Sequence, residues 1–228
     1  MVARSPVTQK GYRAGQKPAN ADQTLPPEVL TLEEITALLS APSPRAPTGI
    51  RNRALIAVLY RGGLRVSEAL ALERRDLNAV AGTITVRHGK GDRARTVGMD
   101  PAAFALVERW LDVRRSQGLG RTSLVFCTLD GRPVQASYVR ALLPRLARKA
   151  GIDKRVHAHG LRHTCAAELA VEGTPVLLIQ QQLGHASLHT TTVYLRSIAP
   201  VELVATMRRR TWAPEGSSVG TAESTRRR

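Results

Sequence analysis

Aromatic residues and cysteines are scarce in this chain of 228 residues. Aromatics make up 4% of a sequence that is 43% hydrophobic, so its core has to rest on Leu, Val, Ala and Ile. Two cysteines, Cys127 and Cys165, are too few for a disulfide framework, which favours a reduced, cytoplasmic protein. No apolar run approaches the ~20 residues that cross a bilayer, and the N-terminus lacks the apolar stretch of a secretory signal. These absences argue against a membrane-spanning or disulfide-stabilised secreted protein.

Acidic residues are outnumbered almost two to one. The chain has 34 Lys and Arg against 18 Asp and Glu, a formal net charge of +16 and a sequence pI near 11.3. A charge of this size attracts polyanions over long distances, and nucleic acid is the commonest polyanion. Arginine, which binds phosphate with two parallel hydrogen bonds, dominates over lysine. The other interpretation is a charge that serves solubility or belongs to basic tails.

Composition and capping signals divide the chain into a basic disordered arm (1–28), one domain (29–212) and a disordered basic tail (213–228). We expect the domain to be mainly α with a small antiparallel β-sheet (α+β). Helices are expected from the N-cap Thr31 to about 39, over 53–61 and 66–72, from the N-cap Asp100 to about 116, and over 135–150, 160–172, 175–183 and 200–210. Strands are expected at 83–87 and 94–97, joined as a hairpin, with a third strand at 124–127.

Arg65 follows the turn Gly62-Gly63 and begins a short predicted helix. A guanidinium at a helix start lies beside free backbone N–H groups, and the two together can bind a phosphate. Glu68 is three residues further on and shares the same helix face, where it could fix the guanidinium. A surface Arg–Glu pair explains these residues about as well.

Lys90 lies between Gly89 and Gly91 at the predicted tip of the hairpin. A lysine there could swing toward a scissile phosphate and protonate a leaving oxygen. A solvated turn lysine is the commoner arrangement for such a sequence. Arg93 and Arg95, close to this tip, are expected to bind backbone phosphates.

His159 and Arg162 stand three residues apart at a predicted helix start, so both can face one target. A surface cluster is the plainer interpretation of that pair. His157, His163 and Cys165 also raise the question of a metal site, but their spacing fits no standard zinc pattern. We therefore expect no metal and no other cofactor, and Cys165 is expected to be a small core residue.

His185 follows Leu183-Gly184, a turn that we expect to lift its imidazole out of the helix end. Tyr194, after three threonines, could simply be a half-buried aromatic residue with its hydroxyl at the surface. With a pKa of about 10, a tyrosine needs a base or a strong positive field to act as a nucleophile. His159 or His185, together with two arginines, would provide both.

Each motif has a structural explanation when taken alone, but together they resemble the catalytic domain of the tyrosine recombinase family, which includes phage integrases and Xer-type recombinases. The matching stretches are Gly63-Leu-Arg-Val-Ser-Glu68, Gly89-Lys-Gly91, His159-Gly-Leu-Arg-His163, Leu183-Gly-His185 and Tyr194. The likeness extends from about Leu30 to about Arg210. The resemblance implies the tyrosine recombinase catalytic-domain fold and site-specific DNA recombination, in integration or excision.

The resemblance also implies a catalytic set of six residues: Arg65, Lys90, His159, Arg162, His185 and Tyr194. In such a site the two arginines clamp the scissile phosphate, and the lysine protonates the leaving 5′ oxygen. The first histidine assists proton transfer at the tyrosine, and the second hydrogen-bonds the phosphate. The tyrosine attacks, which gives a 3′-phosphotyrosyl link and a free 5′ hydroxyl.

Double-stranded DNA is the implied partner, bound by a homotetramer, with an accessory recombinase or a DNA-bending protein as a possible addition. The implied location is the cytoplasm, at the nucleoid. In the family a C-terminal helix often docks on a neighbouring protomer, and Val201 to Met207 is the candidate segment here. A helical DNA-clamping domain usually precedes the catalytic domain, whereas about 29 residues precede the match in this chain.

Two other functions stay open at this point. A type IB topoisomerase shares the fold and the phosphotyrosine chemistry, but such enzymes usually have a lysine where His159 stands. The other is a truncated, non-catalytic DNA-binding or regulatory relative. The predicted helix 135–150, with Arg140, Arg145 and Arg148, is a candidate for the DNA major groove, and a solvated basic face is an equally good interpretation.

Overall fold

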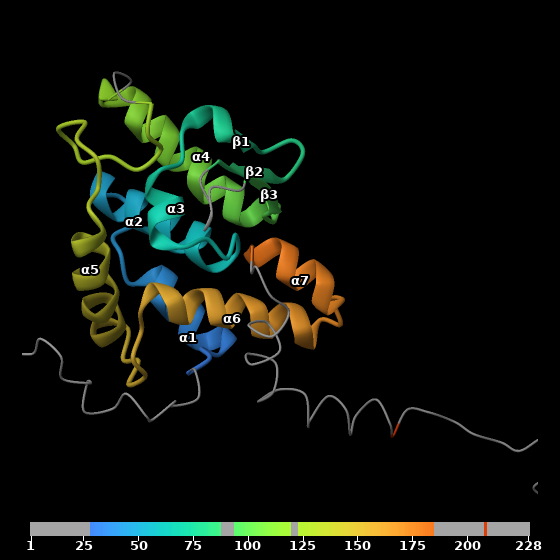
Figure 1. The fold of residues 1–228 in the computed structure, drawn as a ribbon. Coiled ribbons are helices and arrows are strands. Elements are labelled where there is room, and N and C mark those ends of the chain that lie inside the picture. Colours follow the sequence, from blue (N-terminus) through green and yellow to red (C-terminus); the bar gives the residue numbers. More distant parts are fainter. Residues whose placement is uncertain (1–27, 88–93, 120–122, 185–207, 209–228) are drawn as a thin grey trace, which may run out of the picture.

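The computed structural model describes residues 28–87, 94–119, 123–184 and 208. Within them the chain is mainly helical with one small antiparallel sheet, as the sequence predicts (Figure 1). The helices are α1 (Leu32–Ser40), α2 (Pro47–Tyr60), α3 (Val66–Leu70), α4 (Pro101–Ser116), α5 (Ala136–Lys149), α6 (Ala158–Val171) and α7 (Val176–Leu183). The strands are β1 (Leu77–Asn78), β2 (Thr83–Val86) and β3 (Arg95–Gly98), and a 3₁₀ turn (Arg74–Asp76) precedes β1. The arm, the tail and the predicted helix 200–210 lie almost wholly outside these ranges, so the domain limits stay predictions.

Two of the predicted helix starts are confirmed by their caps. Thr31 and Glu34 form a capping box on α1, in which the Thr31 hydroxyl accepts from the Glu34 N–H at 3.2 Å and the Glu34 carboxylate accepts from the Thr31 N–H at 2.7 Å. Asp100 caps α4 by accepting from the Ala103 N–H at 3.0 Å, with Pro101 in the first turn. Local sequence is therefore sufficient to begin both helices.

Helix α2 begins six residues earlier than the predicted start at Arg53. Pro47 stands in its first turn, where a missing N–H costs nothing, and most of the residues that follow are buried, on every side of the helix. The buried Arg51 is accommodated because its guanidinium donates to the Cys127 carbonyl at 3.1 Å and to the Tyr138 hydroxyl at 2.8 Å. A helix buried on all sides has no polar face, so periodicity alone shows only part of its length.

The sheet has the order β1-β2-β3, and the predicted hairpin is confirmed by the pairing of Ile84 with Val97. The predicted third strand at 124–127 is wrong, because that segment makes only isolated bridges, Glu73 with Leu124 and Cys127 with Pro133. Val125, Phe126 and Cys127 are nevertheless fully buried, and the Val125 carbonyl accepts from the Trp110 indole at 2.7 Å. The third strand is β1, which is two residues long and too short to give an alternating pattern.

Helices α6 and α7 form the part of the fold that holds the candidate site. In Figure 1, α6 crosses the molecule below α3, and α7 lies next to the end of β3. The apolar contact between α6 and α7 is a small cluster of Ala166, Ile179 and Leu183, separate from the large core around α2 and α4. The ends of the predicted helices 135–150, 160–172 and 175–183 agree with α5, α6 and α7 to within two residues.

The residues just before α1 are bound to α6 and to the loop ahead of it. The Leu30 backbone N–H donates to the Thr164 hydroxyl at 3.1 Å, a contact buried inside the protein. The Glu28 carboxylate accepts from the Arg155 N–H at 2.8 Å. The first described residues therefore touch the helix that also carries His159 and Arg162.

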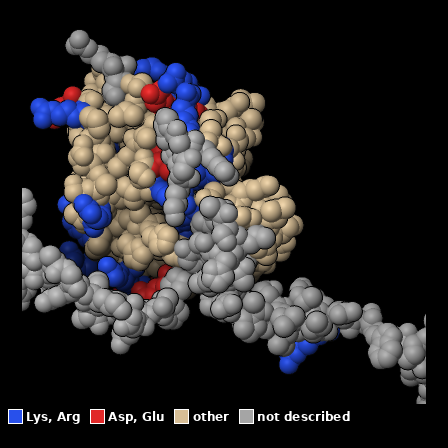
Figure 2. Space-filling view, in the orientation of Figure 1, with Lys and Arg blue, Asp and Glu red and all other residues tan. Residues whose placement is uncertain are grey.

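Among the described residues, no helix is both long and apolar enough to span a bilayer. Lys and Arg side chains are more prominent than Asp and Glu on the face shown in Figure 2, as the net charge of +16 leads one to expect. A surface of this kind suits a polyanionic partner.

Candidate active site

Three of the six predicted catalytic residues, Arg65, His159 and Arg162, lie among the described residues. The other three, Lys90, His185 and Tyr194, lie outside them. The geometry of the site is therefore defined by the two arginines, the first histidine and the groups that hold them.

Arg65 is the N-cap of α3 and follows Gly63, whose positive φ of 61° allows the chain to turn sharply ahead of it. Glu68 accepts from the Arg65 guanidinium at 2.7 Å and from the Arg65 backbone N–H at 2.9 Å. The predicted pairing of Arg65 with Glu68 is thus confirmed. The second terminal nitrogen of the guanidinium, Nη2, donates to the Gly184 carbonyl at 3.2 Å, just past the end of α7.

Arg95 is a partner of Glu68, which corrects the prediction that this arginine faces DNA phosphates. Its two terminal nitrogens donate to the two oxygens of the Glu68 carboxylate at 3.0 and 2.9 Å. Burial alone would raise the pKa of Glu68, but the hydrogen bonds from Arg95 and Arg65 outweigh it and lower the pKa to about 2. The missed signal was strand alternation: Arg95 shares its side of β3 with the buried Val97.

Arg162 is buried, with 3% of its surface exposed. Its guanidinium donates to the Gly63 carbonyl from one terminal nitrogen and to the Leu183 carbonyl from the other. The Leu183 and Gly184 carbonyls belong to the end of α7, where unpaired helix carbonyls favour a cation. Gly184 itself has a positive φ of 63° and ends the helix in the left-handed conformation, as the predicted turn requires.

Arg65 and Arg162 thus bind consecutive carbonyls, although they come from helices almost one hundred residues apart in the chain. Glu68 binds Arg65 and Arg95, while the guanidinium of Arg162 binds backbone carbonyls, so positive charge is in excess among these groups. Two fixed guanidinium groups side by side can bind the non-bridging oxygens of a phosphate and stabilise the charge of its transition state.

His159 lies at the surface on the first turn of α6, one turn before Arg162. Partial desolvation and the positive charge of Arg162 lower its pKa, so its imidazole is neutral near pH 7. Its ring meets His163 edge to face, with 4.2 Å between ring centroids. A neutral imidazole in this position can accept a proton from a nucleophile.

His157 has a role that sequence reasoning missed. Its Nδ1 accepts from the Gly160 N–H at 3.0 Å, which makes it the N-cap of α6. Among the described residues, no group of three His, Cys, Asp or Glu side chains has the geometry of a metal site. Cys165 is buried, and burial raises the pKa of its thiol to about 12, as suits the core residue that the sequence predicts.

Helix α5 presents a basic face to solvent. Arg140, Arg145 and Arg148 are exposed, whereas the opposite side buries Leu142 and Leu146. Both earlier interpretations, a face for the DNA major groove and a solvated face, agree with this arrangement.

The comparisons with known proteins concern the family and the fold of the chain. A sequence model described as the phage integrase family matches residues 28–199. The chain is 35% identical over 170 residues to the tyrosine recombinase XerD of Halalkalibacterium halodurans. This alignment covers 74% of this chain and 56% of that protein. It is 36% identical over 171 residues to the tyrosine recombinase XerC 2 of Ralstonia nicotianae, covering 75% of this chain and 49% of that protein. The chain therefore spans about half the length of these curated relatives.

Solved structures share the fold. The crystal structure of XerA recombinase superposes with a TM-score of 0.72 at 33% identity, covering 85% of this chain and 70% of that one. The XerH site-specific recombinase in a post-cleavage complex with its palindromic difH substrate gives a TM-score of 0.69 at 29% identity, covering 84% and 57%. Because the family model spans three quarters of the sequence and the fold agrees, the chain belongs to the phage integrase family and has the tyrosine recombinase catalytic-domain fold.

Proposed function

We propose that this protein is a site-specific recombinase that cleaves and rejoins DNA strands through a 3′-phosphotyrosyl intermediate, with Tyr194 as the nucleophile. The observation that carries the proposal is the arginine pair: Arg65 and Arg162 bind the consecutive carbonyls of Leu183 and Gly184. In the sequence, Tyr194 comes ten residues after Gly184, so only a short segment connects the carbonyls that bind the two arginines with the proposed nucleophile.

The two guanidiniums would take the non-bridging oxygens of the scissile phosphate. A guanidinium carries five N–H groups in one plane, and the side-chain bonds of Arg65 to Glu68 and to Gly184 come one from each terminal nitrogen, so a phosphate can be added to Arg65 with little loss of existing bonds. Arg65 is the more accessible of the two, with 30% of its side chain exposed, and Glu68 holds it in place. Arg162 is buried and adds a fixed charge that needs no reorganisation during the reaction.

The chemical step is an in-line displacement at phosphorus. The Tyr194 oxygen forms the new P–O bond as the bond to the 5′ oxygen of the next nucleotide breaks. The tyrosine proton passes to His159, whose lowered pKa keeps it ready to accept one, and Lys90 donates a proton to the leaving 5′ oxygen. His185 hydrogen-bonds the phosphate.

Rejoining reverses these steps. When the attacking group is the 5′ hydroxyl of a partner duplex, the strands are exchanged and no high-energy cofactor is consumed. We propose a homotetramer on two DNA sites as the working form, with an accessory recombinase or a DNA-bending protein as a further partner at the nucleoid. XerD and XerC 2 are the tyrosine recombinases to which the chain is similar, which supports this class over a topoisomerase.

The test is a covalent adduct. The 228-residue chain and a Tyr194→Phe variant are incubated with duplexes from the flanks of the gene, including nicked versions that trap the intermediate, and run on denaturing gels. A denaturant-resistant protein–DNA band that Tyr194→Phe loses and Tyr12→Phe keeps is the expected result, and Tyr12 precedes the residues that match the family. Salt-sensitive binding without an adduct would show a non-catalytic DNA-binding relative, and relaxation of supercoiled DNA without site preference would show a topoisomerase.

A further inference from the structure

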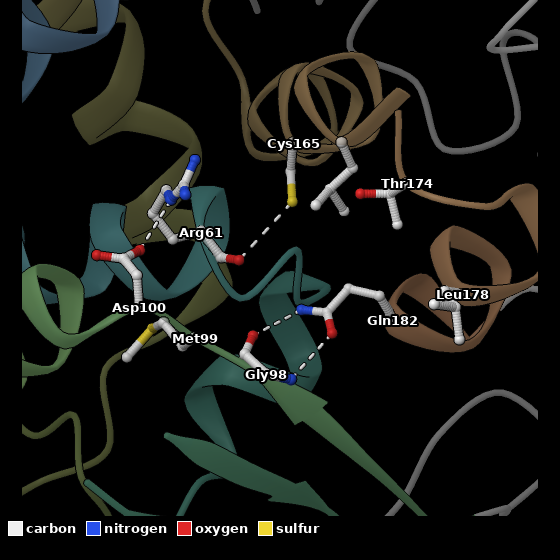
Figure 3. A pocket seen from close by; sticks show the side chains of 9 residues that line it. Arg61, Gly98, Met99, Asp100, Cys165, Thr174, Leu178 and Gln182 are labelled. Atoms are coloured by element: carbon white, nitrogen blue, oxygen red, sulfur yellow. Dashed lines mark hydrogen bonds and ion pairs between the residues drawn. The ribbon is translucent and has the colours of Figure 1, made fainter. Parts of the chain in front are cut away.

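The side chain of Gln182, on the last turn of α7, makes three hydrogen bonds to segments far away in the sequence. Its amide oxygen accepts from the Gly98 N–H at 2.9 Å, and its amide nitrogen donates to the Gly98 carbonyl at 2.7 Å. The same nitrogen donates to the Gly62 carbonyl at 3.2 Å. Figure 3 shows this amide reaching across to Gly98 at the end of β3.

Gly98 is the last residue of β3, an edge strand of the sheet. An edge strand leaves backbone N–H and C=O groups without a strand partner. A glutamine amide carries one acceptor and two donors, so it can replace a peptide group of a missing strand. Gln182 does this for both backbone groups of Gly98 and uses its second donor for the turn that precedes Arg65.

The three consecutive residues at the end of α7 contact three parts of the candidate site. Gln182 binds Gly98 and Gly62, the Leu183 carbonyl accepts from Arg162, and the Gly184 carbonyl accepts from Arg65. The last two contacts involve the guanidiniums that would bind phosphate, whereas the contacts of Gln182 do not. The bonds of Gln182 are therefore independent of what the arginines bind.

Apolar packing contributes little to the position of Gln182. A cavity of about 260 Å³ opens beside it, lined on other sides by Cys165 and Leu178 (Figure 3). The polar wall of this cavity is already paired, since the Arg61 guanidinium binds Asp100 at 2.8 Å and Glu168 at 3.1 Å. The position of the Gln182 side chain is therefore set mainly by its hydrogen bonds, whereas the neighbouring Leu183 is held by burial.

We propose that Gln182 is a positioning residue for DNA cleavage, which holds the end of α7 against β3 and the Gly62 turn. In the chain, α7 ends just before His185 and Tyr194, and β3 begins five residues after Lys90. Gln182 thus connects the element that leads to the nucleophile with the element that follows the general acid. The proposal rests on the cleavage chemistry proposed above.

The first test compares Gln182→Met with wild type. Methionine has about the same length and volume but cannot form the three hydrogen bonds, and the neighbouring cavity leaves room for it. The rate of covalent adduct formation is measured in single turnover at saturating nicked DNA, with the dissociation constant for the same DNA and the thermal unfolding midpoint measured in parallel. Gln181→Met is the matched control, because Gln181 is an exposed neighbour on the same helix.

A loss of about tenfold or more in adduct rate, with DNA affinity within about twofold of wild type, is the result expected of a positioning residue. A merely structural residue would give the other pattern, in which rate and affinity fall together with the folded fraction. Equal rates in Gln182→Met and Gln181→Met would overturn the proposal.

A second measurement reads the contact itself and does not need activity. Amide hydrogen exchange is followed by mass spectrometry in peptides over 94–99 and 176–184, in wild type and both variants. Faster exchange in these two peptides for Gln182→Met alone is expected, with α4 unchanged. If wild type forms no adduct, the proposed function fails, but unchanged exchange in Gln182→Met would independently show that Gln182 does not hold α7.

Discussion

Helix α2 is buried against α4 and α6 along most of its length, whereas α7 buries only two of its residues, Ile179 and Leu183, in a small separate cluster. Long-range hydrogen bonds of three side chains, Gln182, Arg162 and Arg65, compensate at the end of α7. Apolar burial has no preferred direction, so it holds a helix against the core without defining the exact position of the helix end. Hydrogen bonds act over short distances and in fixed directions, so they can define it. The core of this fold and its candidate site are therefore built by different forces.

The largest effects on stability are expected from truncating one buried side chain in each of these two helices. Leu59→Ala in α2 removes a fully buried side chain from the main core and should lower the free energy of unfolding by about 2–5 kcal/mol. Ile179→Ala should instead open α7 locally, with faster amide exchange over 176–184 and protection kept in α2 and α4. Urea unfolding and hydrogen exchange check the two results. Equal global losses would mean that α7 belongs to the same cooperative unit as α2.

Glu68 is the carboxylate that forms ion pairs with Arg65 and Arg95. Its pKa of about 2 lies below the ordinary value of 4.5, so its contribution to stability is complete above pH 4.5 and is lost as the pH falls toward 2. The shift corresponds to at most about 3 kcal/mol, since the partners Arg65 and Arg95 are partly exposed.

Glu68→Gln should therefore be less stable than wild type at pH 7, and the difference in unfolding free energy should shrink between pH 4.5 and 2. Glu108→Gln, on the exposed side of α4, is the matched control and should show no such change. A difference for Glu68→Gln that stays constant down to pH 2 would contradict the ion-pair explanation.

The smallest effect is expected at the cap of α6. Burial and the charge of Arg155 lower the pKa of His157, while Glu28 acts in the opposite direction and His159 stacks nearby. Its cap requires an unprotonated Nδ1, so wild type should lose stability as the pH falls below about 6.5. Because the side chain is exposed, the loss should be only about 0.5 kcal/mol.

His157→Asn keeps a capping oxygen that does not titrate, so its stability should change less than that of wild type between pH 7.5 and 5. His157→Ala, which removes the cap, should be less stable than His157→Asn at both pH values. If the thermal unfolding midpoints of wild type and His157→Asn change by the same amount between pH 7.5 and 5, His157 is not a titrating cap.

Local signals in the sequence were sufficient for much of the fold. The caps Thr31 and Asp100, the hairpin pairing and the helices 135–150, 160–172 and 175–183 were predicted because their causes lie within a few residues. The failures at 124–127 and at the start of α2 have a common origin. Most residues of both segments are buried whichever way their side chains point, and such burial removes the periodicity from which sequence predictions are made.

The contacts of the candidate site likewise fall into those that local sequence could predict and those that it could not. The pairing of Arg65 with Glu68 was predictable because three residues on a helix separate them. The contacts of Arg95 with Glu68 and of Gln182 with Gly98 join residues 27 and 84 positions apart, and no local pattern contains them. The roles of Lys90, His185 and Tyr194 stay predictions, since those residues lie outside the part of the chain that the structure describes.

The buried bond between Leu30 and Thr164 places one end of the described chain two residues from Arg162 along α6. The segment from Glu28 to Leu30 is thus attached to α6 and to the loop ahead of it. A pull on this segment would act directly on the helix that carries His159 and Arg162. If the protein exchanges DNA strands as proposed, a movement of this segment would reach His159 and Arg162 through a single helix.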